Sequence, residues 1–365
     1  MIYYAIGEPE YEASNWYKSI FDGLINEKRQ KRISLCVINS ADELDSIDVG
    51  CEDAVFVIGS ESEWLENTTA ALAERFDNRV VVLGNHTRGT TDVSYSVVTA
   101  DISSDVRMLV EYLISIGKTR IALYGINPSS TSDSYKKTAF LSFGFSERDL
   151  FYNSGSLGDC YERFICHKEE YDAVICVNDY AAISLIKRMG ERRIAITALG
   201  ASKLASYTPV SITHTYRDYR DYAGAGIDLA RLLVKNPTIS SVEVLLRGGF
   251  STGDSTDNLA FDTNASHPIR RSTRGDERFY SDSEICEMIA IENMLERADN
   301  EDMEIIASLL AGATYESIAQ SRYISTNGIK YKLKNIYEMC ASSGRGEFEE
   351  LVRKYVDPKK LIERK

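Results

Sequence analysis

The sequence predicts an α/β fold with two lobes of parallel sheet flanked by helices, followed by an all-helical C-terminal segment. Three observations support this prediction. Apolar, strand-like runs alternate with helical stretches from residue 1 to about residue 250. Ser, Thr, Asp, Asn, Gly and Pro then dominate residues 251–272. From Ser281 onward the apolar residues recur at helical spacing.

The predicted strands are short apolar runs, and several contain no alternating polar residue. Such runs are typical of strands that are buried on both faces, as in a parallel sheet. The predicted strands are Ile2–Gly7, Ile33–Ile38, Ala54–Ile58, Val80–Leu83, Ser94–Val98, Ile121–Tyr124, Ala173–Val177, Ile194–Leu199 and Val242–Leu246. The helical stretches between them include Trp16–Asn26, Trp64–Phe76, Ser104–Ile116, Tyr180–Met189 and Ala223–Val234. About 250 residues is long for one such sheet, which favours two lobes.

The polar stretch divides the chain into an α/β domain at 1–252, a linker at 253–281 and a helical domain at 282–365. Charge is distributed unevenly across these parts. The whole chain has a net charge of −13, whereas residues 300–365 hold 11 Lys and Arg against 10 Asp and Glu. The total argues against nucleic-acid binding by the surface as a whole. Phosphate, however, is contacted by a local basic strip. Residues 300–365 have no acidic excess, so we expect such a strip there.

Several classes of protein are disfavoured by what the sequence lacks. No apolar run approaches the roughly 20 residues of a membrane span, and the first residues lack the basic start of a secretory signal. We therefore expect a cytoplasmic protein with no membrane partner. The seven Cys residues include no CxxC pair, and the four His residues show no metal-ligand spacing. Without a dinucleotide fingerprint or a nucleophile–base constellation, we expect no cofactor, no metal, no catalytic residue and no enzymatic activity.

The C-terminal segment has the pattern of a helix-turn-helix. Its predicted helices are Met303–Ala311, Tyr315–Ser321 and Thr326–Cys340. Gly312 can end the first helix, while Thr314 and Ser325 can cap the second and third. The third helix carries an apolar stripe at spacings of 4, 3 and 4, formed by Ile329, Leu333, Ile336 and Cys340.

The opposite side of this third helix is polar and basic. Asn327, Tyr331 and Lys334 fall there, and Lys330 and Lys332 flank them. A short helix, a tight turn and a longer helix with a basic outer face is the geometry that places one helix in a DNA major groove. Lysines would then contact phosphates, while Asn and Tyr could reach base edges. The alternative that the pattern leaves open is a helical dimerisation or docking module with a solvated lysine face.

Leu310–Ala319 followed by Ile324–Tyr337 resembles the LuxR-type DNA-binding domain. The shared features are a Gly after the first helix, an Ile-Ala pair, an Ile-Ser cap and a Lys-x-x-x-x-Asn-Ile run. The resemblance implies that DNA is contacted by Ser325, Asn327, Lys330, Tyr331, Lys332 and Lys334. Three departures stand out. Gly328 replaces a Thr, which weakens the helix start by up to about 1 kcal/mol; Lys332 replaces a His; and Cys340-Ala341 replaces a Lys-Leu pair.

The α/β domain resembles the ligand-binding domain of the LacI/GalR family, which has a type I periplasmic-binding-protein fold. The stretches that carry the resemblance are Tyr112–Leu123, Asp172–Ala182, Ile212–Asp218 and Leu246–Thr252. It implies a small ligand held between the lobes at the carboxyl ends of strands. The residues that match the family's pocket positions are Ser60, Asn85, Lys136, Asn178, Ser202 and Arg217.

The pocket positions depart from the family pattern in ways that bear on the ligand. Lys136 stands where an Arg usually clamps a sugar, and Lys does not make the same bidentate contact. Asn85 and Ser202 stand where Asp is frequent, so fewer carboxylates are available to accept hydroxyl hydrogen bonds. We therefore expect a sugar or another polar metabolite as effector, or a pocket that has lost its ligand. Asn178 has a structural alternative, since it can cap the helix that follows it.

Together these resemblances predict a transcription regulator in which a small-molecule effector controls binding to a double-stranded DNA operator by a homodimer. The family's DNA-binding domain usually precedes the sensor, whereas here the first strand begins at residue 2 and the DNA-binding segment comes last. Two alternatives were weighed. A response regulator needs an Asp at the end of its third strand, and Val55–Ser60 offers none. A solute-binding or enzymatic α/β protein with a helical protein-interaction tail remains open.

Overall fold

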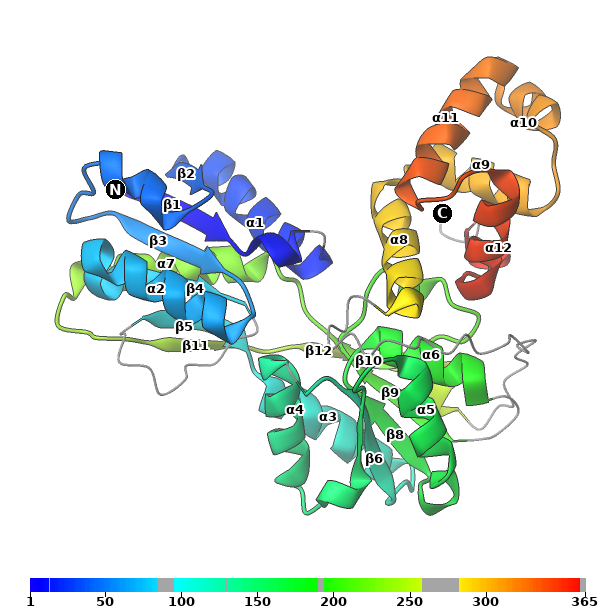
Figure 1. The fold of residues 1–365 in the computed structure, drawn as a ribbon, viewed down its shortest axis with the longest axis horizontal. Helices are drawn as coiled ribbons and strands as arrows, with labels where there is room; N and C mark the ends of the chain where they lie inside the picture. The colour runs from blue at the N-terminus through cyan, green and yellow to red at the C-terminus, as the bar shows by residue number, and fades with distance from the viewer. Residues whose placement is uncertain (13, 85–94, 129, 190–193, 258–281, 362–365) are drawn as a thin grey trace. The chain divides into compact units, whose positions relative to one another are not determined.

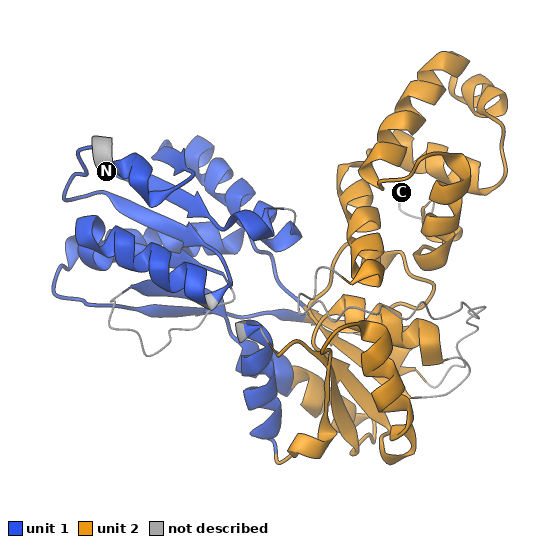
Figure 2. Cartoon of the chain, viewed as in Figure 1, with its two compact units in different colours: residues 1–107, 130–143, 216–249 blue, residues 108–129, 144–215, 250–365 orange. Residues whose placement is uncertain are grey.

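The computed structural model contains two compact units, each built around one six-stranded sheet (Figures 1 and 2). The prediction of a two-lobed α/β fold with a helical C-terminal region is confirmed. Unit 1 comprises residues 1–107, 130–143 and 216–249, and unit 2 comprises residues 108–129, 144–215 and 250–365. The structure describes residues 1–12, 14–84, 95–128, 130–189, 194–257 and 282–361.

The first sheet has the strand order β11-β5-β4-β3-β1-β2, and all neighbouring strands run parallel. Its strands are β1 Ile2–Gly7, β2 Ser34–Ile38, β3 Ala54–Ile58, β4 Val80–Leu83, β5 Ser96–Ala100 and β11 Glu243–Leu246. Tyr3 and Ala5 pack against helices α1 (Asn15–Lys31) and α7 (Asp221–Lys235), while Tyr4 and Ile6 pack toward α2 (Ser62–Phe76). Burial on both faces explains the continuous apolar runs in the sequence.

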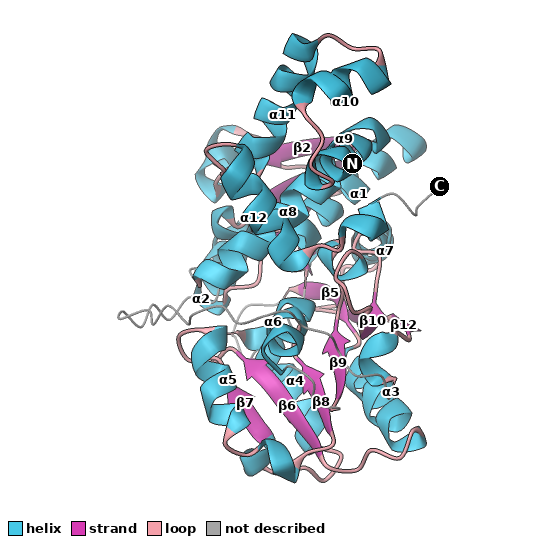
Figure 3. Cartoon of the chain, turned by 90° about the vertical axis from the view of Figure 1, so that its right-hand side faces the viewer, coloured by secondary structure: helices cyan, strands magenta, loops and turns pink. Residues whose placement is uncertain are grey.

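The second sheet has the order β12-β10-β9-β8-β6-β7, and β10, β9, β8, β6 and β7 pair in parallel. Its strands are β6 Ile121–Ile126, β7 Leu150–Tyr152, β8 Ala173–Cys176, β9 Ala195–Leu199, β10 Thr213–Tyr216 and β12 Gly249–Ser251. Helices α5 (Leu157–Ile165) and α6 (Asp179–Met189) cover one face of it (Figure 3). Two further helices are α3 Ile102–Ser115 and α4 Thr131–Leu141.

Both sheets share one winding pattern, because β2-β1-β3-β4-β5 and β7-β6-β8-β9-β10 follow the same order. In this pattern the chain leaves β1 toward one edge of the sheet and leaves β3 toward the other edge, and it leaves β6 and β8 in the same way in the second sheet. In open α/β sheets, ligands bind beside the carboxyl ends of such a pair of strands. In the first sheet these are the ends of β1 and β3, and in the second they are the ends of β6 and β8.

The sequence patterns missed or misplaced several elements, most of them in the second lobe. Strand β7 has only three residues, and β10 is the polar run Thr-His-Thr-Tyr. Thr213 and Thr215 are nevertheless buried, because both hydroxyls have hydrogen-bond partners. The Thr213 hydroxyl donates to the Gly253 carbonyl at 3.1 Å, and the Thr215 hydroxyl accepts from the Gly200 amide at 3.1 Å. Helices α4 and α5 were also not predicted, and β5 lies two residues later than expected.

The predicted linker begins inside the second lobe. Asp254–Thr256 form a 3-10 helix, and Ser255 is fully buried, with its hydroxyl donating to the Ile196 carbonyl at 2.6 Å. The lobe therefore continues through Asp257, five residues beyond the predicted boundary at 252. The rest of the predicted linker, residues 258–281, lies outside the described residues.

The C-terminal region consists of α8 Ser283–Arg297, α9 Asn300–Leu310, α10 Tyr315–Arg322, α11 Thr326–Met339 and α12 Arg345–Tyr355, followed by a 3-10 helix at Pro358–Leu361. Asp282 and Asp299 cap the first two helices with side-chain hydrogen bonds. The apolar core of these helices is continuous with the core of the second lobe around α5 and α6. No helix in the described part of the chain is long and apolar enough to span a membrane.

Candidate functional site

The turn between α10 and α11 is capped as the sequence predicted. The Thr314 hydroxyl accepts the Ser317 amide at 3.1 Å, and the Ser325 hydroxyl accepts the Gly328 amide at 3.1 Å. Between the two helices, Tyr323 adopts the left-handed conformation with φ 55°. Short polar caps at both helix starts and a single left-handed residue give a tight turn of three residues, from Tyr323 to Ser325.

Helix α11 has one buried and one exposed face. Ile329, Leu333 and Ile336 are at most 2% exposed, as the apolar stripe predicted. Asn327, Lys330, Tyr331 and Lys334 are all exposed. Their spacing of 3, 4 and 7 residues from Asn327 places them on one face of the helix. Tyr323 and Tyr331 are 99% and 68% exposed, more than any other large apolar side chain of the described residues. The region therefore presents two lysines and two tyrosines to solvent.

Three of the six predicted DNA contacts interact with other residues of the domain: Lys332, Ser325 and the exposed Lys334, whose Nζ lies 3.7 Å from Glu338 Oε1 one turn later. Lys332 is half-buried, and its Nζ lies 2.6 Å from Glu301 Oε2 and 3.3 Å from Asp302 Oδ1 on α9. These hydrogen bonds raise the pKa of Lys332, chiefly through Glu301. Ser325 is exposed but uses its hydroxyl as the helix cap. The structure therefore assigns Lys332 to the contact between α9 and α11, and leaves Lys330 and Lys334 as the outward cations of the predicted set.

Packing explains two departures from the LuxR-type pattern. A Cβ atom on Gly328 would lie 2.8 Å from Ile324 Cγ2, so a glycine accommodates this isoleucine at the start of α11. Cys340 is buried, its thiol lies 3.7 Å from the Ala290 carbonyl of α8, and α11 ends at Met339. The small side chain at this position lets the end of α11 approach α8.

In the first sheet, Ser60 follows the carboxyl end of β3, where the sequence predicts a ligand. A residue that the sequence analysis did not predict there, Glu8, forms hydrogen bonds with this segment. The buried carboxylate of Glu8, directly after β1, accepts the Ser60 amide at 2.8 Å and the Glu61 amide at 3.1 Å. Burial raises the pKa of Glu8, and it raises that of Tyr11 to about 12. The rings of Tyr11 and Trp16 lie 5.5 Å apart. A carboxylate directly after a buried strand was the available signal in the sequence.

In the second sheet, Asn178 and Ser202 follow neighbouring strands and are linked through Asp179. Asn178 Oδ1 accepts the Ala181 amide at 2.9 Å, which is the helix-capping alternative. Asp179, 5% exposed, accepts the Ser202 amide at 2.8 Å and the Ser202 hydroxyl. Burial raises the pKa of Asp179. The carboxylate that a sugar site would need is thus present one residue beyond the predicted Asn178.

The two predicted basic pocket residues are both held by carboxylates. Lys136 on α4 lies 2.8 Å from Asp133 one turn earlier. Arg217 donates to Asp105 and, at 3.3 Å, to the Leu246 carbonyl, and both members of the Arg217–Asp105 pair have side chains less than 10% exposed. A ligand would have to compete with these carboxylates for either cation. Asn85 lies outside the described residues.

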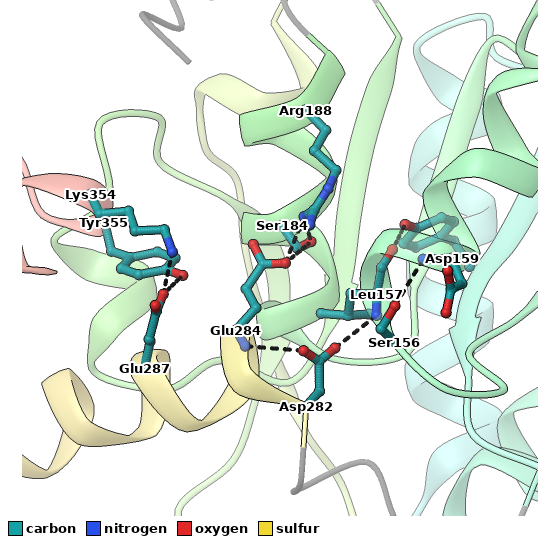
Figure 4. Close-up of polar contacts among 11 residues, drawn as sticks. Ser156, Leu157, Asp159, Ser184, Arg188, Asp282, Glu284, Glu287, Lys354 and Tyr355 are labelled. Atoms are coloured by element: carbon teal, nitrogen blue, oxygen red, sulfur yellow. Dashed lines mark hydrogen bonds and ion pairs between the residues drawn. The ribbon is translucent and has the colours of Figure 1, made fainter. Parts of the chain in front are cut away.

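Helix α8 is anchored to the second lobe by acidic side chains (Figure 4). Asp282 accepts the Leu157 amide at the start of α5 at 2.8 Å. Glu284 pairs with Arg188 of α6 at 2.7 Å and accepts the Ser184 hydroxyl at 3.2 Å. The far end of the helical region is attached as well, since the Asp357 amide donates to the Tyr207 carbonyl at 2.8 Å. Polar bonds at both ends, together with the shared core, join the helical region to the second lobe.

Solved structures of LacI-family regulators resemble the chain in fold. The regulator CcpA from Weissella paramesenteroides with bound glucose aligns with a TM-score of 0.53 and 18% identity, covering 70% of this chain and 99% of that one. CcpA of Lactococcus lactis aligns at 0.55 and 16% identity, covering 70% and 100%. The Lac repressor bound to ONPG aligns at 0.55 and 14% identity, covering 70% and 82%. No protein-family model and no curated protein matches the chain.

The described residues contain no group of three or more His, Cys, Asp and Glu side chains placed to hold a metal ion. Among the described residues, all seven cysteines are free thiols. The described residues offer hydrogen-bonding and charged groups at the strand ends of each lobe, and a basic, aromatic helix face in the C-terminal region.

Proposed function

We propose that this protein is a transcription regulator that binds double-stranded DNA through α11 of a LuxR-type helix-turn-helix and responds to a small polar effector held by its α/β lobes. The observation that carries the proposal is the exposed face of α11, with Asn327, Lys330, Tyr331 and Lys334 on one side of a capped helix. Lysines at this spacing suit phosphate oxygens, and an Asn side chain can bond the edge of adenine.

The fold supports the sensing part of the proposal. The similar structures include regulators solved with glucose and with sucrose. In this chain, Glu8 and Asp179 supply carboxylates at the strand ends of the two lobes, and Tyr11 and Trp16 supply aromatic rings in the first. Carboxylates accept hydroxyl hydrogen bonds, so a polyhydroxylated metabolite fits the donor and acceptor set. We propose that the protein acts in the cytoplasm. We also propose that it acts as a homodimer, because one recognition helix alone binds DNA weakly.

The test is the salt dependence of DNA binding by the full chain. Duplexes enriched from a randomised 30-base-pair pool would be titrated by fluorescence anisotropy between 50 and 200 mM salt. Each phosphate contact contributes about 0.9 to the slope of log K against log salt, so Lys330→Ala and Lys334→Ala should each lower the slope by about 0.9 per bound copy.

Lys332→Ala is the matched control, because the structure pairs this lysine with Glu301 and Asp302. It should leave the slope nearly unchanged. If Lys330→Ala and Lys334→Ala bind every enriched duplex as wild type does, α11 does not read DNA. If no duplex is enriched at all, a solute-binding protein with a helical interaction tail becomes the better description.

A further inference from the structure

Glu292 of α8 is a buried carboxylate that faces a loop of the second lobe. Its side chain is 1% exposed. One of its oxygens accepts the Lys203 amide at 2.6 Å, and the other accepts the Leu204 amide. The Lys203 ammonium in turn donates to the Leu295 carbonyl in the last turn of α8. Because both oxygens of Glu292 bond consecutive amides, the position of the loop and the position of α8 depend on each other.

The same loop is bonded to the sensor's strand ends one residue earlier. Ser202 donates both its amide, at 2.8 Å, and its hydroxyl to the carboxylate of Asp179 at the start of α6. Residues 202–204 therefore link two carboxylates, one from the candidate ligand site and one from the first helix of the C-terminal region. The Lys203 amide shares a planar peptide unit with Ser202, so a displacement of Ser202 also displaces this amide.

We propose that Glu292 is the positioning residue through which occupancy of the strand ends of the second lobe is transmitted to the DNA-binding helices. The proposal rests on the function proposed above and gives its regulation. A ligand hydroxyl that bonds Asp179 or Ser202 takes one of the bonds that now hold Ser202 in place. The loop then shifts relative to Glu292, and α8 follows or loses two hydrogen bonds.

The charges around Glu292 make this contact sensitive to its surroundings. The pKa of Glu292 is raised to about 7, chiefly by burial and in addition by the nearby charges of Asp179 and Glu296, while the two loop amides act to lower it. Among the described residues, the ionisable side chains of Lys203 in the loop and of His214 of β10, beside Asp179, also lie near this pair. Two buried carboxylates that disfavour each other's charge are coupled, so a ligand that donates to Asp179 also alters the contact at Glu292.

The other polar contacts of α8 allow the role of the Glu292–loop contact to be tested without detaching α8 from the lobe. Asp282 bonds Leu157, and Glu284 pairs with Arg188, without involving residues 202–204. Glu292→Gln keeps the shape of the side chain and one acceptor oxygen, so α8 should stay attached while the link to one loop amide is lost. Glu284→Gln is the matched control, since it weakens an anchor on the same helix and leaves the loop contact intact.

The first measurement is amide hydrogen exchange of the full chain, followed by mass spectrometry at pH 6 and pH 8. Ser202→Ala, which perturbs only the sensor side, should speed exchange in α8 about three- to tenfold, the effect of losing one hydrogen bond. Glu292→Gln should speed exchange at Lys203 and Leu204 by a similar factor and abolish the effect of Ser202→Ala on α8. In Glu284→Gln that effect should persist. If Ser202→Ala leaves the exchange rates in α8 unchanged, the proposed transmission through Glu292 is overturned.

The second measurement is a double-mutant cycle on DNA affinity, with the enriched duplex as probe. Ser202→Ala should change the Kd at least threefold, and in the Glu292→Gln background it should change it less than 1.5-fold. Additive effects would refute the proposal. If the full chain binds no duplex, the proposed function fails, yet the exchange experiment still decides whether Glu292 couples the loop to α8. Far-ultraviolet circular dichroism of each variant confirms that it is folded.

Discussion

Replacing Tyr323 with Gly should stabilise the protein while weakening the proposed binding to DNA. Tyr323 has φ 55° and is 99% exposed, so it has left-handed backbone strain and almost no packing to offset it. The left-handed conformation costs a non-glycine residue roughly 1–2 kcal/mol. Glycine relieves that cost but loses about 0.5–1 kcal/mol through its larger unfolded-state entropy. The net gain is about 0.5–1 kcal/mol, or a rise in Tm of about 1–4 °C for a unit of this size.

The expected loss in DNA binding follows from the position of Tyr323, two residues before the cap of α11. A tyrosine hydroxyl there can donate to a phosphate, and one such bond is worth about 0.5–1.5 kcal/mol, or roughly two- to twelvefold in Kd per half-site. The matched control is Ala341→Gly, at another exposed left-handed residue with φ 51°. Calorimetry and anisotropy titrations should show both variants stabilised and only Tyr323→Gly weakened on DNA. Equal affinities would mean that Tyr323 contacts no DNA.

Three further predictions concern stability. Arg217→Ala should destabilise the chain by about 3–5 kcal/mol in urea unfolding, because it leaves the buried carboxylate of Asp105 unpaired; Arg220→Ala, at an exposed pair, should cost less than about 1 kcal/mol. Phe348→Ala should lower the free energy of unfolding by about 3–5 kcal/mol, since the ring is fully buried. The pKa of Glu292 is about 7 in the folded chain against 4.5 ordinarily. The protonated side chain therefore stabilises the folded chain fully below pH 4.5, and this stabilisation is lost as the pH rises to about 7. Relative to Glu292→Gln, the free energy of unfolding of the wild type should fall by about 3 kcal/mol over this range. Parallel profiles of unfolding free energy against pH for the two proteins would contradict this.

The fold was predictable because most of its central strands are buried on both faces. A run such as Ala54–Ile58 has no polar residue and is fully buried in the structure. The elements that were missed are those in which side-chain hydrogen bonds replace apolar character, as at Thr213 and Thr215 in β10. Hydropathy cannot detect a threonine whose hydroxyl is satisfied by a distant backbone group, because that partner is known only once the chain has folded.

For the candidate sites, helical spacing could predict which side chains face outward but not which of them pair inside the domain. Helical spacing placed Lys330 and Lys332 equally well at the flanks of the basic face, but it could not show that Lys332 meets Glu301 and Asp302 across the domain. Glu292 is a similar case. It falls among the apolar residues of α8, where a lone carboxylate looks like an interruption of the stripe. Its partners are two backbone amides nearly ninety residues away, and a backbone amide leaves no mark in a sequence.

The attachment of the helical region bears on how the proposed sensor could act on the proposed DNA-binding segment that follows it in the chain. Transmission through a tether would require only that the two parts be joined covalently. Here Asp282 and Asp357, at the two ends of the helical region, are both bonded to the second lobe, and Glu292 is bonded to it in between. The helical region is therefore joined to that lobe by these contacts as well as by the covalent chain. If the proposed function holds, a change at the strand ends of the lobe can reach α11 through them, so the order of the domains along the chain imposes no constraint on the coupling.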